Sequence, residues 1–155
     1  MEFKETNQLD SFYKEQVRLL WNQEYPFIIC QKSTEDFEKY LSSLKDKNHI
    51  LILKKNNLLG WYCDFRREGE RWFAMILDKK IQGIGIGKKI IEKVKRKHKE
   101  LNGWVIVEEN YLKENNEVYK SPVGFYKKLG FVIFEDKKLD SSILKAVKIQ
   151  LKSEK

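Results

Sequence analysis

The segment Gln82–Lys88 constrains the fold of this chain more than any other. It carries three glycines at alternate positions, Gly83, Gly85 and Gly87. It also lies between an apolar run that predicts a strand and a periodic stretch that predicts a helix. A strand, a tight loop, a helix and a further strand form a right-handed crossover with parallel strands in nearly all cases. The sequence therefore predicts an α/β chain with a parallel pair at its centre.

This glycine segment also predicts an anion site. The first backbone N–H groups of a helix have no intrahelical partner and lie at the positive end of the helix dipole. Glycine lets a phosphate approach the backbone closely, so Gln82–Lys88 is expected to hold a phosphate or pyrophosphate. We expect the side chains of Ile84 and Ile86 to point the other way and to anchor the loop to the core.

Two familiar phosphate loops do not match the spacing. A dinucleotide-binding loop that starts at Gly83 needs glycine at position 88, where Lys88 stands. A Walker loop that ends at Gly87-Lys88 needs glycine at position 82 and Ser or Thr at position 89, where Gln82 and Lys89 stand. Both of these nucleotide-binding classes are excluded.

Hydrophobic periodicity places the remaining elements along the chain. Helices are expected over Leu9–Trp21, from Ser33 to Leu44, from the glycine segment to Leu101 with Asn102-Gly103 as its stop, and from Ser121-Pro122 to Leu129. Strands are expected at His49–Lys54, Leu58–Phe65, Arg71–Leu77, Trp104–Val107, Phe131–Phe134 and Val147–Leu151. The strand around Met75 and the strand around Ile106 should lie side by side.

The charge of the chain admits an anionic partner without identifying one. The sequence holds 31 Lys and Arg against 23 Asp and Glu, a formal net charge of +8. The basic residues are densest over Lys88–Lys99, where apolar positions recur at helical spacing, so a solvated helix face is favoured over a nucleic-acid footprint. A nucleic-acid partner is therefore the least favoured interpretation.

The size and residue usage of the chain indicate its setting. The length of 155 residues suits a single domain, 1–155. No secretion signal or membrane span is visible, and Cys30 and Cys63 are expected to be reduced core residues, which predicts a cytoplasmic protein. With only His49 and His98 available as imidazole ligands, no metal is expected.

Two motifs give the chain a resemblance to a known family. Gln82, Gly85 and Gly87 match the pattern of Gln or Arg, two residues, Gly, one residue, then Gly or Ala, which marks the acetyl-CoA loop of the GNAT N-acetyltransferases. The later run Phe125-Tyr126 to Gly130-Phe131 resembles the second hallmark of that family. The order of elements is similar to the family from Leu9 to Leu151.

The resemblance implies a fold and a co-substrate. The fold is a mixed, mostly antiparallel twisted sheet whose central parallel pair splays apart to hold acetyl-CoA, with helices on its flanks. The acceptor would be a primary amine that attacks acetyl-CoA directly. Met75, Ile76 and Leu77 would hydrogen-bond the pantetheine arm, and the pyrophosphate would lie on Gln82, Gly83, Ile84, Gly85, Ile86, Gly87 and Lys88.

The same resemblance suggests catalytic roles. Tyr126 aligns with the tyrosine proposed as general acid toward the departing thiolate. The strand Arg71–Leu77 has no acidic residue, unlike some relatives, so Glu108 and Glu109 are the candidate general bases. Asn110 is the nearest match to an asparagine that contacts pantetheine.

The acceptor and the assembly stay open from the sequence. Plausible walls for an apolar or cationic acceptor are Trp21, Tyr25, Phe27, Trp61, Tyr62 and Trp72, although such aromatics are more often core residues. An acyl-CoA-binding sensor or interaction module without catalysis is the alternative function. The oligomeric state is undetermined, with a homodimer as one candidate.

Overall fold

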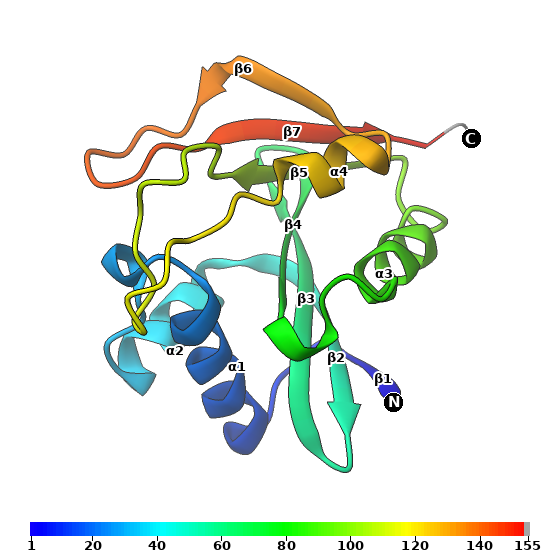
Figure 1. Cartoon of the computed structure of the whole chain (residues 1–155). Coiled ribbons are helices and arrows are strands. Elements are labelled where there is room, and N and C mark those ends of the chain that lie inside the picture. The colour runs from blue at the N-terminus through cyan, green and yellow to red at the C-terminus, as the bar shows by residue number, and fades with distance from the viewer. Residues whose placement is uncertain (154–155) are drawn as a thin grey trace.

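A mixed seven-stranded sheet organises residues 1–153, the part of the chain that the computed structural model describes (Figure 1). The strand order is β1-β2-β3-β4-β5-β7-β6, in which the pair β4–β5 is parallel and every other pair is antiparallel. The strands are β1 (Glu2–Thr6), β2 (Lys45–Lys54), β3 (Asn57–Arg67), β4 (Glu70–Leu77), β5 (Glu100–Val105), β6 (Val132–Lys138) and β7 (Val147–Lys152). The predicted fold class is confirmed.

The helices lie on opposite faces of this sheet (Figure 1). Helices α1 (Ser11–Glu24) and α2 (Thr34–Ser43) cover one face, while α3 (Ile86–Val94) and α4 (Val123–Lys128) cover the other. Short 3-10 turns, η1 (Phe27–Ile29) and η2 (Lys79–Ile81), follow α1 and β4. Each face has its own apolar cluster, and successive residues of a strand alternate between the two.

A polar side chain caps the N-terminus of each of the first two helices. The Asp10 side chain accepts a hydrogen bond from the Tyr13 N–H, and Ser33 accepts one from the Asp36 N–H. These contacts satisfy backbone donors that the helices leave without partners. Tyr25 is extended because it precedes Pro26, and so α1 ends before it as predicted.

The third predicted helix ends earlier than expected, and the following strand begins earlier. Helix α3 stops at Val94, and Leu101, Asn102 and Gly103 belong to β5. Gly103 lets the Phe73 ring pack closely on this strand, because a Cβ there would lie 3.0 Å from a ring carbon of Phe73. The glycine marks a close side-chain contact and is not a helix stop.

The central parallel pair is shorter than the prediction implied. Strands β4 and β5 pair through Trp72 and Asn102 alone, so Met75 and Ile106 lie beyond the paired region. Strand β1, which pairs with β2 at the edge of the sheet, was missed because only Phe3 of its five residues is strongly apolar. Cys63 is buried as expected, whereas Cys30 is only half-buried and lies outside the apolar clusters.

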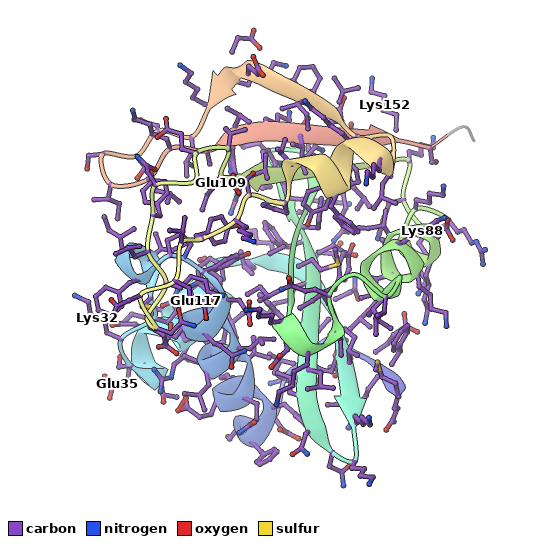
Figure 2. All side chains as sticks on the ribbon, viewed as in Figure 1. Lys32, Glu35, Lys88, Glu109, Glu117 and Lys152 are labelled. Carbon is purple, nitrogen blue, oxygen red and sulfur yellow. The ribbon has the colours of Figure 1, made fainter. Side chains whose placement is uncertain are left out.

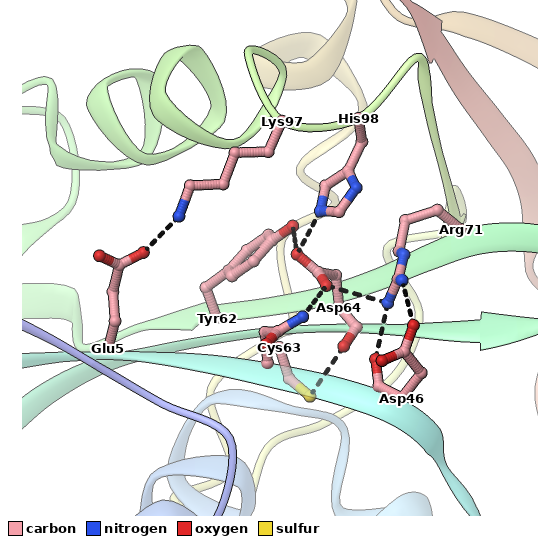
Figure 3. Close-up of polar contacts among 9 residues, drawn as sticks. Glu5, Asp46, Tyr62, Cys63, Asp64, Arg71, Lys97 and His98 are labelled. Atoms are coloured by element: carbon pink, nitrogen blue, oxygen red, sulfur yellow. Dashed lines mark hydrogen bonds and ion pairs between the residues drawn. The ribbon is translucent and has the colours of Figure 1, made fainter.

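A buried carboxylate ties the sheet to the segment after α3 (Figure 3). Asp64 of β3, which is 2% exposed, accepts a hydrogen bond of 2.7 Å from the Tyr62 hydroxyl. The Arg71 guanidinium and the His98 Nε2 lie 3.2 and 3.3 Å from its two carboxylate oxygens. Burial, and then the charge of Asp64, raise the pKa of the Tyr62 phenol, so Tyr62 stays a hydrogen-bond donor.

His49 makes the stability of the fold sensitive to acid. It is buried, it accepts a hydrogen bond of 3.0 Å from the Trp61 indole at Nδ1, and burial lowers its pKa to about 4. Between pH 6.5 and 4 the unfolded chain therefore binds a proton that the folded chain does not. We expect the free energy of unfolding to fall by about 3 kcal/mol from this group as pH drops from 7 to 4.

Urea unfolding at a series of pH values measures this fall. The matched variant is His49→Asn, whose side-chain oxygen can replace Nδ1 as the acceptor for Trp61 but does not titrate. The difference between wild type and variant should change with pH over this window. A difference that is independent of pH would contradict the assignment.

Candidate active site

A large cavity opens where β4 and β5 separate. It has a volume of about 950 Å³, within the range of small-molecule sites, and its walls come from α1, β3, β4, the glycine segment, α4 and the segments on either side of α4. Because the strands diverge beyond Trp72 and Asn102, side chains from both faces of the sheet line one continuous space. A molecule in this space can reach both faces.

Strand β4 contributes both an unpaired edge and alternating side chains. Its residues pair with β3 along the whole strand, whereas its other edge pairs with β5 only at Trp72. Beyond that point the segment Met75, Ile76 and Leu77 has a free edge, where the backbone groups that do not pair with β3 are available to an added strand or to an amide-containing chain. All three residues line the cavity.

The glycine segment has the geometry of an anion cradle. Gly83 and Gly85 have φ of +75° and +89°, and no atom lies within 4 Å of a Cβ built at either position. Gly85 caps α3, and the Lys89 N–H donates to its carbonyl at 3.1 Å. The N–H groups of Ile86, Gly87 and Lys88 precede that first helical bond, so they suit a bound diphosphate.

Packing, and not only phosphate approach, requires the third glycine. A Cβ at Gly87 would lie 2.7 Å from the Phe125 ring, so this position holds α3 against α4. Gly83, Gly85, Ile86 and Gly87 line the cavity, and so does Gln82. Lys88 is exposed outside the cavity lining, on the outer side of α3 (Figure 2).

The prediction that Ile84 and Ile86 anchor the loop to the core holds for Ile86 and is wrong for Ile84. Ile86 packs against the apolar cluster of α3 and α4, but Ile84 is 63% exposed and lies outside the cavity lining. The loop is held by polar contacts instead. The Gln82 amide donates to the Leu77 carbonyl at 2.8 Å, and Asp78 accepts from the Lys80 N–H at 2.9 Å.

Tyr126 of α4 is buried and lines the cavity. Its ring packs edge-on against Phe73 and Phe131, with ring centroids 5.8 and 5.1 Å away. Burial, and then the neighbouring Tyr119, raise the pKa of the Tyr126 phenol well above 10. Its hydroxyl is therefore protonated at neutral pH.

The candidate bases lie outside the cavity lining. Glu108 and Glu109 are exposed in the segment after β5, and Figure 2 shows Glu109 there. Glu108 forms an ion pair of 3.7 Å with Lys145, and Glu109 accepts a hydrogen bond of 2.9 Å from the Ser121 N–H. Asn110 is also exposed and outside the lining. A base role for either glutamate would need connecting water, and it stays a prediction.

Glu24 is a cavity residue that the sequence analysis missed. It is 8% exposed in the last turn of α1, and it accepts hydrogen bonds from the Lys79 N–H and the Gln82 amide at 3.2 and 3.4 Å. Lys113 lies 3.6 Å from the same carboxylate. The sequence did indicate that Glu24 is buried, because it falls three residues after Trp21 on the apolar face of an amphipathic helix.

Of the aromatic residues predicted to line the acceptor site, some line the cavity and others lie in the core or at the surface. Trp21, Tyr25 and Trp72 line the cavity, whereas Trp61 and Tyr62 are fully buried in the two apolar clusters. Phe27 is 64% exposed and does not line it. Further aromatic wall residues are Tyr40, Phe65, Phe73, Trp104, Tyr119 and Phe125.

Neither a cluster of metal ligands nor a membrane-spanning helix is found in residues 1–153. No group of three or more His, Cys, Asp or Glu side chains in residues 1–153 is arranged to hold a metal ion. Within the same residues, no helix has the length and apolar character to cross a membrane.

The fold and the cavity define a class of acyltransferase, and comparisons with known proteins agree. The family described as the acetyltransferase (GNAT) domain matches residues 46–133, more than half of the chain. The chain therefore belongs to the GNAT acetyltransferase family, whose members use acetyl-CoA as co-substrate. A comparison with curated protein sequences gives no match.

Solved structures share the fold at low sequence identity. An aminoglycoside 6'-N-acetyltransferase complexed with coenzyme A is 13% identical with a TM-score of 0.70, and the match covers 98% of this chain and 97% of that one. The ribosomal-protein-S18-alanine N-acetyltransferase from Escherichia coli is 11% identical with a TM-score of 0.63, over 97% and 94% of the two chains. A spermidine N-acetyltransferase chimera built in part from Vibrio cholerae is 16% identical with a TM-score of 0.60, over 98% and 96%.

The geometry of the glycine segment predicts a substitution that blocks acetyl-CoA binding. Gly85→Glu puts a carboxylate where the diphosphate is expected, so we expect the Kd of acetyl-CoA to rise at least about 100-fold through bulk and like charge. Isothermal titration calorimetry measures this change.

The matched control is Gly69→Glu in the turn between β3 and β4. Gly69 also has a positive φ, of +77°, and open space at its Cβ, so both variants carry similar backbone strain. The control should bind acetyl-CoA like the wild type. Equal affinity of the two variants would contradict the placement of the diphosphate.

Proposed function

We propose that this chain is an N-acetyltransferase that moves the acetyl group of acetyl-CoA directly to a primary amine. The observation that carries the proposal is the cavity itself, because it joins the glycine cradle to an aromatic space on the opposite face of the sheet. The amine nitrogen attacks the thioester carbonyl carbon, forming a C–N bond while the C–S bond breaks. The amine loses a proton, and the departing sulfur gains one.

We assign the proton donated to sulfur to the Tyr126 hydroxyl. The supporting observation is the place of Tyr126 in the cavity wall. Burial raises the pKa of its phenol, which keeps the hydroxyl protonated but also makes it a weaker acid toward the thiolate. A thiol has a pKa of about 8.5, so the thiolate is already a fair leaving group and the acid lowers the barrier only in part.

Replacing the hydroxyl tests this role. We expect Tyr126→Phe to lower kcat by up to about 100-fold without abolishing turnover, because the ring and its packing remain. Single-turnover measurement of thiol release, with acetyl-CoA affinity measured in parallel, checks the effect on chemistry. Wild-type kcat in Tyr126→Phe under chemistry-limited conditions would remove the acid role.

The proton that the acceptor amine loses must be taken up by a group other than Tyr126, which serves the departing sulfur. An alkyl amine with a pKa of about 10.4 is mostly protonated at pH 7, so the rate should rise with pH until the free base predominates. Glu108 and Glu109, the candidate bases, lie outside the cavity lining and would act through connecting water, so the glutamate that serves as base should move the alkaline limb of the pH–rate profile when it is changed to Gln. An unmoved limb in both variants would count against both residues. A shift of that limb in either variant would assign the base role to that glutamate.

We further propose that the whole chain acts as one cytoplasmic domain. One sheet runs from β1 to β7 through the described residues, and neither Cys30 nor Cys63 is in a disulfide. Both features suit a single folding unit in a reducing compartment.

Thiol release with any amine supports the transferase function. Acetyl-CoA binding without transfer to any amine would favour a sensor.

A further inference from the structure

Arg67 occupies a distinctive position in the aromatic part of the cavity. It ends β3 on the face that packs against α1 and α2, two residues after Phe65. Its guanidinium carbon lies 5.0 Å from the centroid of the Phe65 ring and 5.4 Å from that of Trp72. Arg67 is half-buried and lines the cavity at the end where β4 begins.

The Arg67 guanidinium keeps its hydrogen-bonding capacity. Its cation–π contacts with the Phe65 and Trp72 rings use no oxygen acceptor, so the guanidinium N–H groups are available for a carboxylate. Among residues 1–153, no carboxylate forms an ion pair with Arg67. The Nε1 N–H of Trp72, beneath the same guanidinium, is likewise a buried donor without a partner in the described residues.

Both carboxylates of the cavity lining are already paired with lysines. Glu24 contacts Lys113 at 3.6 Å and lies beside the glycine segment, and Glu117 contacts Lys79 at 3.4 Å. The cavity lining contains four basic side chains, Arg67, Lys79, Lys113 and Lys120, against two acidic ones, Glu24 and Glu117. A polycationic acceptor therefore meets a net positive wall.

We infer that the acceptor is an amine with an aromatic or apolar body and a carboxylate, and that Arg67 binds this carboxylate. This inference rests on the proposed transferase function and names the acceptor class for it. The aromatic walls take the body of the acceptor, and the guanidinium takes the anion. Polyamines and aminoglycosides do not fit this charge pattern, although enzymes that act on them share the fold.

Matched pairs of acceptors test the inference. L-phenylalanine and phenethylamine differ only in the carboxylate, so the ratio of their kcat/KM values in thiol release isolates its contribution. A charge-assisted hydrogen bond changes this ratio by about tenfold or more. We expect the wild-type ratio to favour L-phenylalanine and to fall by about tenfold in Arg67→Met. Comparing proteins cancels the difference in amine pKa between the two acceptors.

The neighbouring arginine supplies the control. Arg66 is exposed on the opposite face of β3, so Arg66→Met removes the same charge without touching the cavity and should keep the wild-type ratio. Acetyl-CoA affinity should be unchanged in both variants, which verifies that they fold. An unchanged ratio in Arg67→Met, or a faster wild-type reaction with spermidine than with L-phenylalanine, would overturn the inference.

A binding arm separates this inference from the transferase proposal. 3-Phenylpropionate carries the ring and the carboxylate but no amine, and calorimetry measures its affinity without turnover. Binding that weakens by about tenfold in Arg67→Met supports the anion site even if no amine is acetylated, in which case only the transfer proposal fails. Equal binding to wild type and Arg67→Met would overturn the anion site itself.

Discussion

The one position at which the parallel strands β4 and β5 pair, Trp72 with Asn102, determines the rest of the site. Asn102 is completely buried at this contact; its amide donates to the Arg71 carbonyl at 3.1 Å, and its side-chain oxygen accepts from Gln150 at 2.9 Å. These bonds join β4, β5 and β7 at one point. The Phe73 ring then lies against Gly103, so the strands are fixed together at one end and diverge beyond it. The cavity exists because the paired region of β4 and β5 is short, so the two strands separate beyond it.

Local patterns predicted most of the elements because each depends on neighbouring residues. Ser33 caps the N-terminus of α2, and Pro26 sets the end of α1. Gly130, with a φ of +97°, directly follows the C-cap of α4 and stops that helix. The glycine segment was also readable, because its backbone conformation needs particular residues at particular positions. Such features are encoded within a few residues of where they act.

The remaining features depend on distant contacts that a single sequence does not display. Asn102-Gly103 reads locally as a helix stop, and only the packing of Phe73 shows why glycine stands inside β5. Strand β1 owes its existence to pairing with β2 and not to its own apolar pattern. Glu24 lies 58 residues from the Gln82 amide that it contacts, so its place beside the cofactor loop depends on the tertiary fold.

The cavity between β4 and β5 is lined from both faces of one strand. Along β4, Phe73, Met75 and Leu77 belong to the side of α3 and α4, and Trp72, Ala74 and Ile76 belong to the side of α1 and α2. All six residues line the same cavity. Because neighbouring residues of β4 face opposite sides, a substitution at one position changes the wall on one side of the sheet and leaves the other side as it is.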